Sequence, residues 1–284
     1  MEKIGIISGS GSLPYEIAEI ASKKGIETFF VFLKGSAEET LENLKKNKKK
    51  TNIKFAIAEK NFIWSSITNV GKILDFFREN SVQHLLLAGG IKRPPLLSLI
   101  PDLTGAKLLK RLISLKNAGD DSALREIIKF LEEHNFSVIG VSDIAPELLT
   151  KKGFITKNKP NERQLFDIQK GFEVAKTLGN LDIGQAVIVQ DGEVLGVEGA
   201  EGTSELIKRC AKLQRGGKGA ILVKSCKPSQ DKRADLPSIG INTIYLLKDL
   251  KFSGVALSAE ESIILDFETT KHQAEKDNIF IYSS

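Results

Sequence analysis

A loop of closely spaced charges follows an apolar segment between Ala220 and Gly240, where the sequence reads AILVKSCKPSQDKRADLPSIG. Asp231 and Asp235 supply carboxylate oxygens, the ligands that Mg²⁺ or Mn²⁺ prefers. The cations of the loop are Lys224, Lys227, Lys232 and Arg233. We expect both aspartates to be catalytic and to hold a divalent cation. The alternative is a solvated loop with ordinary ion pairs.

The charge of this region indicates an anionic ligand. From Lys208 to Arg233 the sequence has nine basic residues and one acid, Asp231. This excess could offset the charge of a phosphate ester, so we expect Lys227 and Arg233 to bind substrate and Lys224 to act in catalysis. The whole chain carries 41 basic and 36 acidic side chains, a net charge of +5. No recognised nucleic-acid-binding module accompanies this charge, so nucleic acid is not an expected partner.

A glycine-rich turn follows the first apolar segment of the chain. Gly9, Ser10 and Gly11 open the first expected helix, where backbone N–H groups can bind phosphate. Pro14 replaces the third glycine of the dinucleotide fingerprint, and no acid ends the second strand. The turn therefore predicts phosphate or nucleotide contact without NAD.

Two further loops have the composition of ligand-binding turns. The segment after the apolar run 83–88 contains four candidate substrate contacts, because ligands of parallel sheets bind at the carboxyl ends of strands. These are Gly89, Gly90, Lys92 and Arg93. Gly202 and Thr203 form the other candidate, with Thr203 as the expected helix N-cap and an ordinary capped helix as the alternative.

The residue types favour metal-assisted hydrolysis over a nucleophilic triad. The sequence has no G-x-S-x-G elbow, and its three histidines are far apart in the chain. They show no metal-ligand spacing, so a zinc site is not expected. Cys210 and Cys226 form no C-x-x-C pair, which is typical of a reducing compartment.

The pattern of apolar segments predicts an α/β protein with two domains. Residues 1–135 alternate strands and helices as in a Rossmann-like parallel sheet. Residues 136–160 are mixed in composition and predict a linker. Residues 161–284 predict a catalytic mixed α/β domain, in which Asp191-Gly192 marks a tight hairpin between 185–190 and 193–197.

No apolar run reaches the ~20 residues of a membrane-spanning helix, and the chain opens with an expected strand instead of a signal peptide. We therefore expect a cytoplasmic protein. The lysine run at 45–50 is typical of a solvated segment, although it could also touch anionic lipid.

Six segments, taken in order, resemble the LpxI-type UDP-2,3-diacylglucosamine pyrophosphatases over nearly the whole chain. They are GSGSLP, LAGGIKRP, GDDSALREI, LDIGQAVIVQDG, EGAEGTSELIKR and VKSCKPSQDKRADLPSIG. The resemblance implies a cytoplasmic enzyme of lipid A biosynthesis, peripherally associated with the inner membrane. It would use Mg²⁺ to hydrolyse UDP-2,3-diacylglucosamine to lipid X (2,3-diacylglucosamine 1-phosphate) and UMP, with water attacking the phosphate next to the sugar.

The resemblance also implies an essential aspartate within QDKRADLP, and Asp231 and Asp235 both remain candidates for it. Leu96, Leu97, Leu99 and Ile100 could contact acyl chains, and the hydrophobic core is their alternative place. The sequence leaves the oligomeric state open, with a homodimer among the options. A non-hydrolytic sugar-nucleotide-binding or regulatory protein is the competing interpretation.

Overall fold

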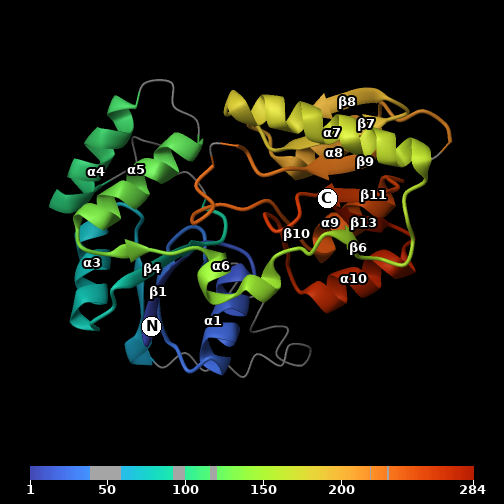
Figure 1. The fold of residues 1–284 in the computed structure, drawn as a ribbon. Coiled ribbons are helices and arrows are strands. Elements are labelled where there is room, and N and C mark those ends of the chain that lie inside the picture. Colours follow the sequence, from blue (N-terminus) through green and yellow to red (C-terminus); the bar gives the residue numbers. More distant parts are fainter. Residues whose placement is uncertain (39–58, 92–99, 116–119, 218, 229) are drawn as a thin grey trace. The chain divides into compact units, whose positions relative to one another are not determined.

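The computed structural model describes residues 1–38, 59–91, 100–115, 120–217, 219–228 and 230–284 (Figure 1). The contacts of these residues divide the chain into two compact units. The first unit comprises Met1–Pro146 and Arg233–Asp235, and the second comprises Glu147–Lys232 and Leu236–Ser284. A short piece of the charged loop thus belongs, by its contacts, to the first unit.

The first unit contains a parallel sheet with the strand order β3-β2-β1-β4-β5 in its described part. The strands are β1 (Lys3–Ser8), β2 (Glu27–Leu33), β3 (Phe62–Ser65), β4 (His84–Ala88) and β5 (Ser137–Val138). The chain moves outward from β1 to β3 and returns to β4 on the other side of β1. The order therefore reverses between β1 and β4, as in doubly wound sheets, and confirms the predicted Rossmann-like architecture.

Helices cover both faces of this sheet. They are α1 (Leu13–Lys23), α3 (Val70–Glu79), α4 (Leu103–Ser114), α5 (Asp120–Glu133) and α6 (Val141–Ile144), with a short 3₁₀ turn, η1 (Glu59–Asn61). Alternate residues of β2 point to opposite faces. Phe29 and Val31 join the core with α3 and α5, whereas the Phe30 and Phe32 rings stack on Tyr15 of α1 at centroid distances of 6.1 and 6.4 Å.

The second unit contains a mixed sheet with the order β6-β13-β11-β9-β7-β8 in its described part. The strands are β6 (Gly153–Phe154), β7 (Ala186–Gln190), β8 (Glu193–Val197), β9 (Ile221–Lys224), β11 (Gly254–Leu257) and β13 (Phe280–Ser283). β9, β11 and β13 are parallel, and the other pairings are antiparallel. This arrangement confirms the predicted mixed α/β class.

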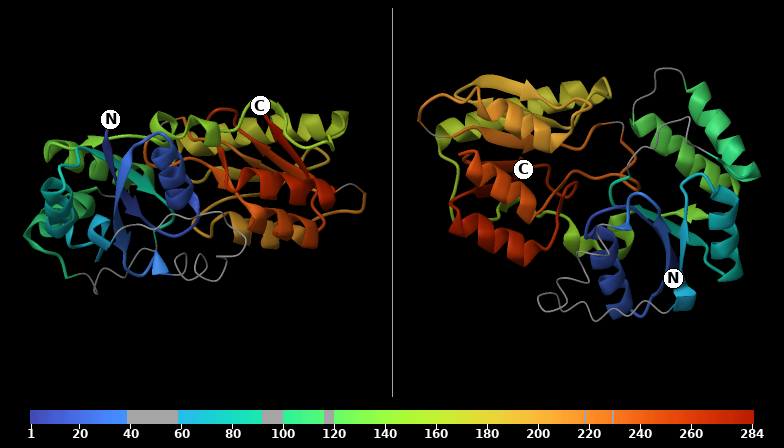
Figure 2. Two further views of the ribbon diagram at one scale, coloured as in Figure 1. Left: turned by 90° about the horizontal axis from the view of Figure 1, so that it is seen from below. Right: turned by 180° about the vertical axis from the view of Figure 1, so that it is seen from behind.

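The helices of the second unit lie on the two faces of its sheet (Figure 2). They are α7 (Glu162–Asn180), α8 (Thr203–Ala211), α9 (Ile241–Asp249) and α10 (Phe267–Lys276). Val223 of β9 packs with Ile168 of α7, whereas its neighbour Leu222 packs with α8, α9 and α10. A small parallel pair, β10 (Ser238–Ile239) and β12 (Ile263–Ile264), connects the returning charged loop to the segment after β11.

The second unit contains the predicted hairpin but not the predicted helix cap. The hairpin β7–β8 is confirmed, with Asp191 and Gly192 at positive φ of 51° and 79°. Thr203 as a helix N-cap is wrong, because Gly202 is the cap residue at φ 80° and Thr203 begins α8. Cys210 and Cys226 are both buried.

The segment 136–160, predicted as a linker, contains β5, α6, the 3₁₀ turn η3 (Pro146–Leu148) and β6. The division between the units falls inside it, after Pro146. The apolar pattern at 54–58 predicts a further strand, but this segment lies outside the described residues. So do the lysine run 45–50, Lys92, Arg93, Leu96, Leu97 and Leu99. Ile100 is described and is 85% exposed, so it is not a core residue.

Candidate functional site

Three parallel strands of the second unit end together at one edge of its sheet. Leu257 of β11 lies opposite both Lys224 of β9 and Ser283 of β13. The charged loop leaves this edge after Lys224, and the segment 258–262 leaves it after Leu257. Ligands of α/β sheets bind outside the carboxyl ends of strands, so the loop that the sequence singled out lies where this architecture places its sites.

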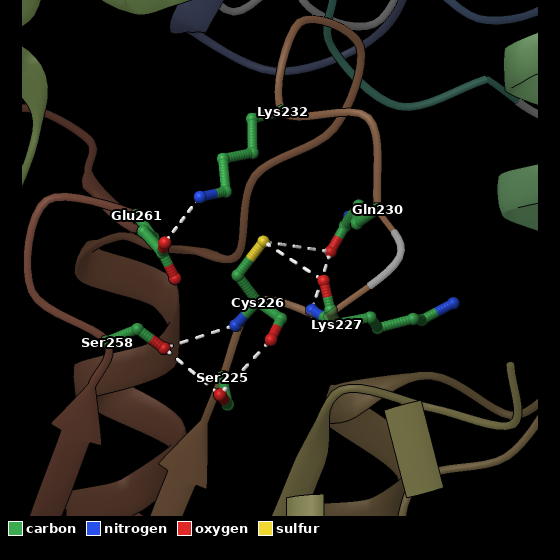
Figure 3. A network of polar contacts seen from close by, with 7 residues as sticks. All are labelled: Ser225, Cys226, Lys227, Gln230, Lys232, Ser258 and Glu261. Atoms are coloured by element: carbon green, nitrogen blue, oxygen red, sulfur yellow. Dashed lines mark hydrogen bonds and ion pairs between the residues drawn. The ribbon is translucent and has the colours of Figure 1, made fainter. Parts of the chain in front are cut away.

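Hydrogen bonds fold the first part of the loop into a compact turn (Figure 3). The Ser258 hydroxyl accepts a hydrogen bond from the Cys226 N–H at 3.1 Å and contacts the Ser225 hydroxyl at 3.2 Å. Gln230 Oε1 accepts from the Lys227 N–H at 3.0 Å and from Cys226 Sγ at 3.3 Å. Because Cys226, Lys227 and Gln230 are buried, this turn is a fixed base for the more exposed residues that follow.

The lysines of the loop do not converge on one point. Lys224 is buried, and its ammonium donates a hydrogen bond to the Ser238 carbonyl at 3.0 Å. Lys227 forms an ion pair with Asp182 at 2.7 Å, and Lys232 pairs with Glu261 at 2.5 Å. Figure 3 shows the Lys227 and Lys232 side chains extending in opposite directions from the loop.

The two lysine ion pairs differ in exposure. The Lys227 side chain is 9% exposed and that of Asp182 is 22% exposed, so solvent screens this pair weakly. Lys232 is 57% exposed. Its hydrogen bond to Glu261 raises the pKa of Lys232, although burial acts in the opposite direction. The pair of Lys232 is therefore the ordinary surface interaction that the alternative interpretation of the loop describes.

Arg233 begins the part of the loop that belongs to the first unit. Its guanidinium lies 2.6 Å from Glu132 Oε1 and donates a weaker hydrogen bond to the Val138 carbonyl at 3.4 Å. Ala234 packs against the hydrophobic core of that unit. Asp235 is assigned to the same unit, whereas Asp231 is assigned to the second, and both side chains are half-buried.

Sequence reasoning missed the acids that pair with these cations. Asp182, Glu261 and Glu132 are distant from the loop in sequence, and only the folded chain brings them to it. Asp182 stands within LDIGQAVIVQDG, one of the segments of the family resemblance, but no local pattern marks it as the partner of Lys227. Phosphate binding by Lys227 or Arg233 stays a prediction. It requires each cation to bind phosphate beside, or in place of, the carboxylate with which it now pairs.

The two glycine-rich turns of the first unit meet at the reversal point of its sheet. β1 and β4 are neighbours, and the chain leaves them through Gly9-Ser10 and Gly89-Gly90. The Ser10 N–H donates to the Gly90 carbonyl at 2.8 Å, and the Gly90 N–H donates to the Ser10 carbonyl at 2.9 Å. A Cβ atom on Gly9 would overlap the Gly90 carbonyl, so close approach of the two turns requires glycine.

These contacts limit what the turns can offer a ligand. The N–H groups of Gly9, Ser10 and Gly90 are bonded within the protein, so a phosphate would have to use groups closer to the start of α1. Gly11 there is exposed and has φ 98°. The Glu16 carboxylate accepts a hydrogen bond from the Ser12 hydroxyl at 2.6 Å in the same first turn, and its charge disfavours an anion.

The turn before α8 is built around carboxylates. Buried Glu198 accepts hydrogen bonds from the Thr203 hydroxyl at 2.6 Å and from the Gln185 N–H at 3.1 Å. Glu201 pairs with Arg209 at 2.7 Å, and this hydrogen bond lowers the pKa of Glu201. Substrate binding by Gly202 and Thr203 stays a prediction, although the present partner of the Thr203 hydroxyl is an acid of the same turn.

The described residues contain no cluster of three or more His, Cys, Asp or Glu side chains suited to a metal ion. A pocket of about 150 Å³ lies beside the start of α7, lined in part by Asn161, Gln164 and Asp167. Its lining includes none of the predicted site residues. The pocket is therefore not the site predicted from the sequence.

Family models cover almost the whole chain. The model of the LpxI N-terminal domain matches residues 3–148, and the model of the LpxI C-terminal domain matches residues 151–282. The chain belongs to the LpxI family. A curated relative from Caulobacter vibrioides (strain ATCC 19089 / CIP 103742 / CB 15), UDP-2,3-diacylglucosamine pyrophosphatase LpxI, is 30% identical over 287 aligned residues. The alignment covers 99% of this chain and 97% of the relative.

The two LpxI domain matches meet close to the division between the units. The matches change between residues 148 and 151, and the contacts change after Pro146. Asp231 and Asp235 fall within the LpxI C-terminal match, although the contacts of Arg233–Asp235 belong to the first unit. The charged loop thus falls within the C-terminal LpxI match, and three of its residues, Arg233–Asp235, are assigned to the first unit.

Proposed function

We propose that this chain hydrolyses the diphosphate of UDP-2,3-diacylglucosamine and releases UMP and 2,3-diacylglucosamine 1-phosphate. The observation that supports this is the alignment over 99% of the chain with a relative named as a UDP-2,3-diacylglucosamine pyrophosphatase. Water attacks the phosphorus next to the sugar, the anhydride bond breaks, and UMP leaves with the bridging oxygen. No helix within the described ranges has the length and apolarity to cross a bilayer. We further propose a cytoplasmic enzyme that is peripheral to the inner membrane.

Mg²⁺ is the proposed cofactor, with Mn²⁺ as a substitute. Asp231 and Asp235 fit this role, because protein-bound Mg²⁺ is commonly held by one or two carboxylates while substrate phosphates and water complete its shell. When bound, the ion would neutralise charge on the diphosphate and polarise a phosphoryl oxygen.

The side chains of the loop have separate proposed roles. Lys224 is buried at the end of β9 and donates to the Ser238 carbonyl, so its ammonium is held in one position at the strand edge. A cation fixed in this way can stabilise charge that develops on the leaving phosphate. Lys227 and Arg233 are proposed to bind phosphate. The glycine-rich turns at Gly9–Gly11, Gly89–Gly90 and Gly202–Thr203 are proposed substrate contacts, each within its own unit.

The competing interpretation was a sugar-nucleotide-binding protein without hydrolytic activity. Family membership and the pyrophosphatase name of the relative favour the enzyme. Substitution of the aspartates separates the two: an enzyme loses turnover and retains binding of the lipid substrate, whereas a binding protein has no turnover to lose.

The direct experiment is product analysis with the purified full-length chain. UDP-2,3-diacylglucosamine is incubated with Mg²⁺, with Mn²⁺, or with EDTA, and nucleotide products are separated by ion-exchange chromatography. We expect UMP and the lipid monophosphate in equal amounts with either metal and neither product with EDTA. Absence of UMP under all metal conditions would falsify the proposed function.

A further inference from the structure

Helix α4 is firmly attached to the first unit along one side (Figure 1). Leu108 is buried in the core and Leu112 packs against it. A Cβ atom on Gly105 would overlap the Thr68 carbonyl, so the start of the helix packs closely against the backbone at Thr68. Arg111 pairs with Glu126 at 3.3 Å and with Glu133 at 2.7 Å on α5. The orientation of α4 about its own axis is therefore fixed.

The opposite side of α4 exposes aliphatic and basic residues together. Leu103 is 87% exposed and Ile113 is 62% exposed. Lys107 and Lys110 lie between them on the same side, because 3.6 residues per turn place all four within about a third of the circumference. Ile100, 85% exposed, precedes this face, and its carbonyl accepts a hydrogen bond from Thr68 at 3.1 Å.

This face carries positive charge, and helix α4 itself supplies no acid to balance it. Helix α4 has no acidic residue, and the acid before it, Asp102, caps the helix by accepting from the Gly105 N–H at 2.6 Å. Neither Lys107 nor Lys110 forms an ion pair with any residue in the described ranges. Scattered exposed aliphatics are common on protein surfaces, but aliphatics that alternate with lysines on one fixed helix face suit a narrower set of partners.

We propose that the exposed face of α4, formed by Leu103, Lys107, Lys110 and Ile113, docks on an anionic lipid surface. Lysines near such a surface attract acidic headgroups, and aliphatic side chains enter the headgroup–acyl boundary. An aliphatic protein groove would satisfy Leu103 and Ile113 but would leave both ammonium groups without counter-charge. The inference rests on the proposed function in one respect: docking brings the enzyme to the membrane that holds an acylated substrate.

Vesicle flotation of the full-length protein tests this proposal without substrate. Vesicles of phosphatidylcholine alone are compared with vesicles that also contain phosphatidylglycerol. We expect binding to the anionic vesicles that weakens with added salt. Each lysine near an anionic surface is worth about fivefold in binding, so K107Q/K110Q should bind about 25-fold more weakly. L103Q/I113Q should lose at least about tenfold, because two aliphatic side chains no longer enter the bilayer.

The matched control is K212Q/L213Q, which removes an exposed lysine and a 51% exposed leucine from the second unit. Its binding should equal that of the wild type. Equal binding to neutral and anionic vesicles, or unchanged binding of K107Q/K110Q, overturns the proposal. So does a concentration-dependent dimer that these variants abolish, because the face would then contact a second copy.

Activity measurements distinguish this inference from the proposed function. With substrate dispersed in detergent, K107Q/K110Q should retain wild-type turnover, and with substrate in anionic vesicles it should be slower. Vesicle binding without any turnover would contradict the proposed function and leave the docking face supported. Turnover that is equally fast for wild type and variant on vesicles would contradict the docking face alone.

Discussion

The ion pair of Lys227 with Asp182 is more buried than that of Lys232 with Glu261, so its removal should destabilise the fold more. Asp182→Ala leaves the Lys227 ammonium near-buried without its carboxylate. Breaking a fully buried pair costs ~3–5 kcal/mol, and the partial exposure of Asp182 reduces our expectation to roughly 2 kcal/mol of unfolding free energy. Urea unfolding measures this value.

Lys232→Ala is the control in the same loop. Its pair with Glu261 is largely exposed, so the loss should be at most about 1 kcal/mol. If Asp182→Ala and Lys232→Ala lower the free energy of unfolding equally, the Lys227–Asp182 pair does not stabilise the loop more than the exposed pair does.

Asp231 and Asp235 are predicted to act in the reaction and not in folding. Both are half-buried on a loop. Asp231→Asn or Asp235→Asn at the essential position should lower turnover roughly 10²–10³-fold, the loss typical of one electrostatic group removed from a reaction centre. Steady-state rates of UMP release and binding of the lipid substrate are measured for each variant. Wild-type turnover in both variants would contradict the assignment of this loop.

The acid stability of the second unit should depend on Asp277, which follows α10. Burial acts to raise the pKa of Asp277, but hydrogen bonds from Gln273 and Lys248 outweigh it, and the pKa lies below its ordinary 3.8. A carboxylate with a depressed folded-state pKa stabilises the fold above its unfolded-state pKa, and the stabilisation is lost as the pH falls through the folded-state value.

Asp277→Asn should therefore lower the free energy of unfolding near neutral pH. It should also make that free energy less dependent on pH in the acid range. Urea midpoints of wild type and variant from about pH 6 to about pH 2 check this sign. Parallel curves for the two proteins would show that Asp277 is not the group that titrates.

At the scale of the elements, the two glycine-rich turns of the first unit should behave as a packing contact. Gly9→Ala places a Cβ against the Gly90 carbonyl, and Gly89→Ala places one against the Ser10 carbonyl at φ 89°. Each substitution should destabilise the protein by about 2 kcal/mol or more, because backbone atoms must shift.

Gly11→Ala is the control for these turns. Gly11 also has a positive φ, 98°, but a Cβ there meets no atom within 4 Å, so only the strain of the backbone, about 1 kcal/mol, is added. Thermal unfolding of the three variants checks whether Gly9→Ala and Gly89→Ala lose more stability than Gly11→Ala. Equal losses of stability in all three variants would show that backbone strain, and not contact between the turns, is the reason why these positions require glycine.

The elements were predictable from sequence where the local pattern was strong. The apolar run at 83–88 and the Asp-Gly turn between 185–190 and 193–197 signal their structures within a few residues, and both are confirmed by β4 (His84–Ala88) and by the β7–β8 hairpin. The cap of α8 was not predictable, because Thr203 is an excellent N-cap by type but Glu198 engages its hydroxyl inside the helix start. This side-chain contact overrides the helix-cap preference of threonine.

At the scale of the molecule, the sequence placed the charged loop correctly on an α/β sheet but could not give its partners. The loop was expected to gather its cations, whereas Lys227, Lys232 and Arg233 pair with acids 45, 29 and 101 residues away. Distances of that kind follow from the topology of both units, and no local pattern encodes them. The site residues themselves remain predictions.

One measurement tests the central claim most directly: hydrolysis of UDP-2,3-diacylglucosamine in H₂¹⁸O with Mg²⁺, followed by ³¹P NMR of the products. The account predicts UMP without ¹⁸O and a lipid monophosphate that carries one ¹⁸O, because water attacks the phosphorus next to the sugar. Label in UMP would contradict the site of attack. Release of UDP and unphosphorylated lipid sugar would contradict hydrolysis of the diphosphate altogether.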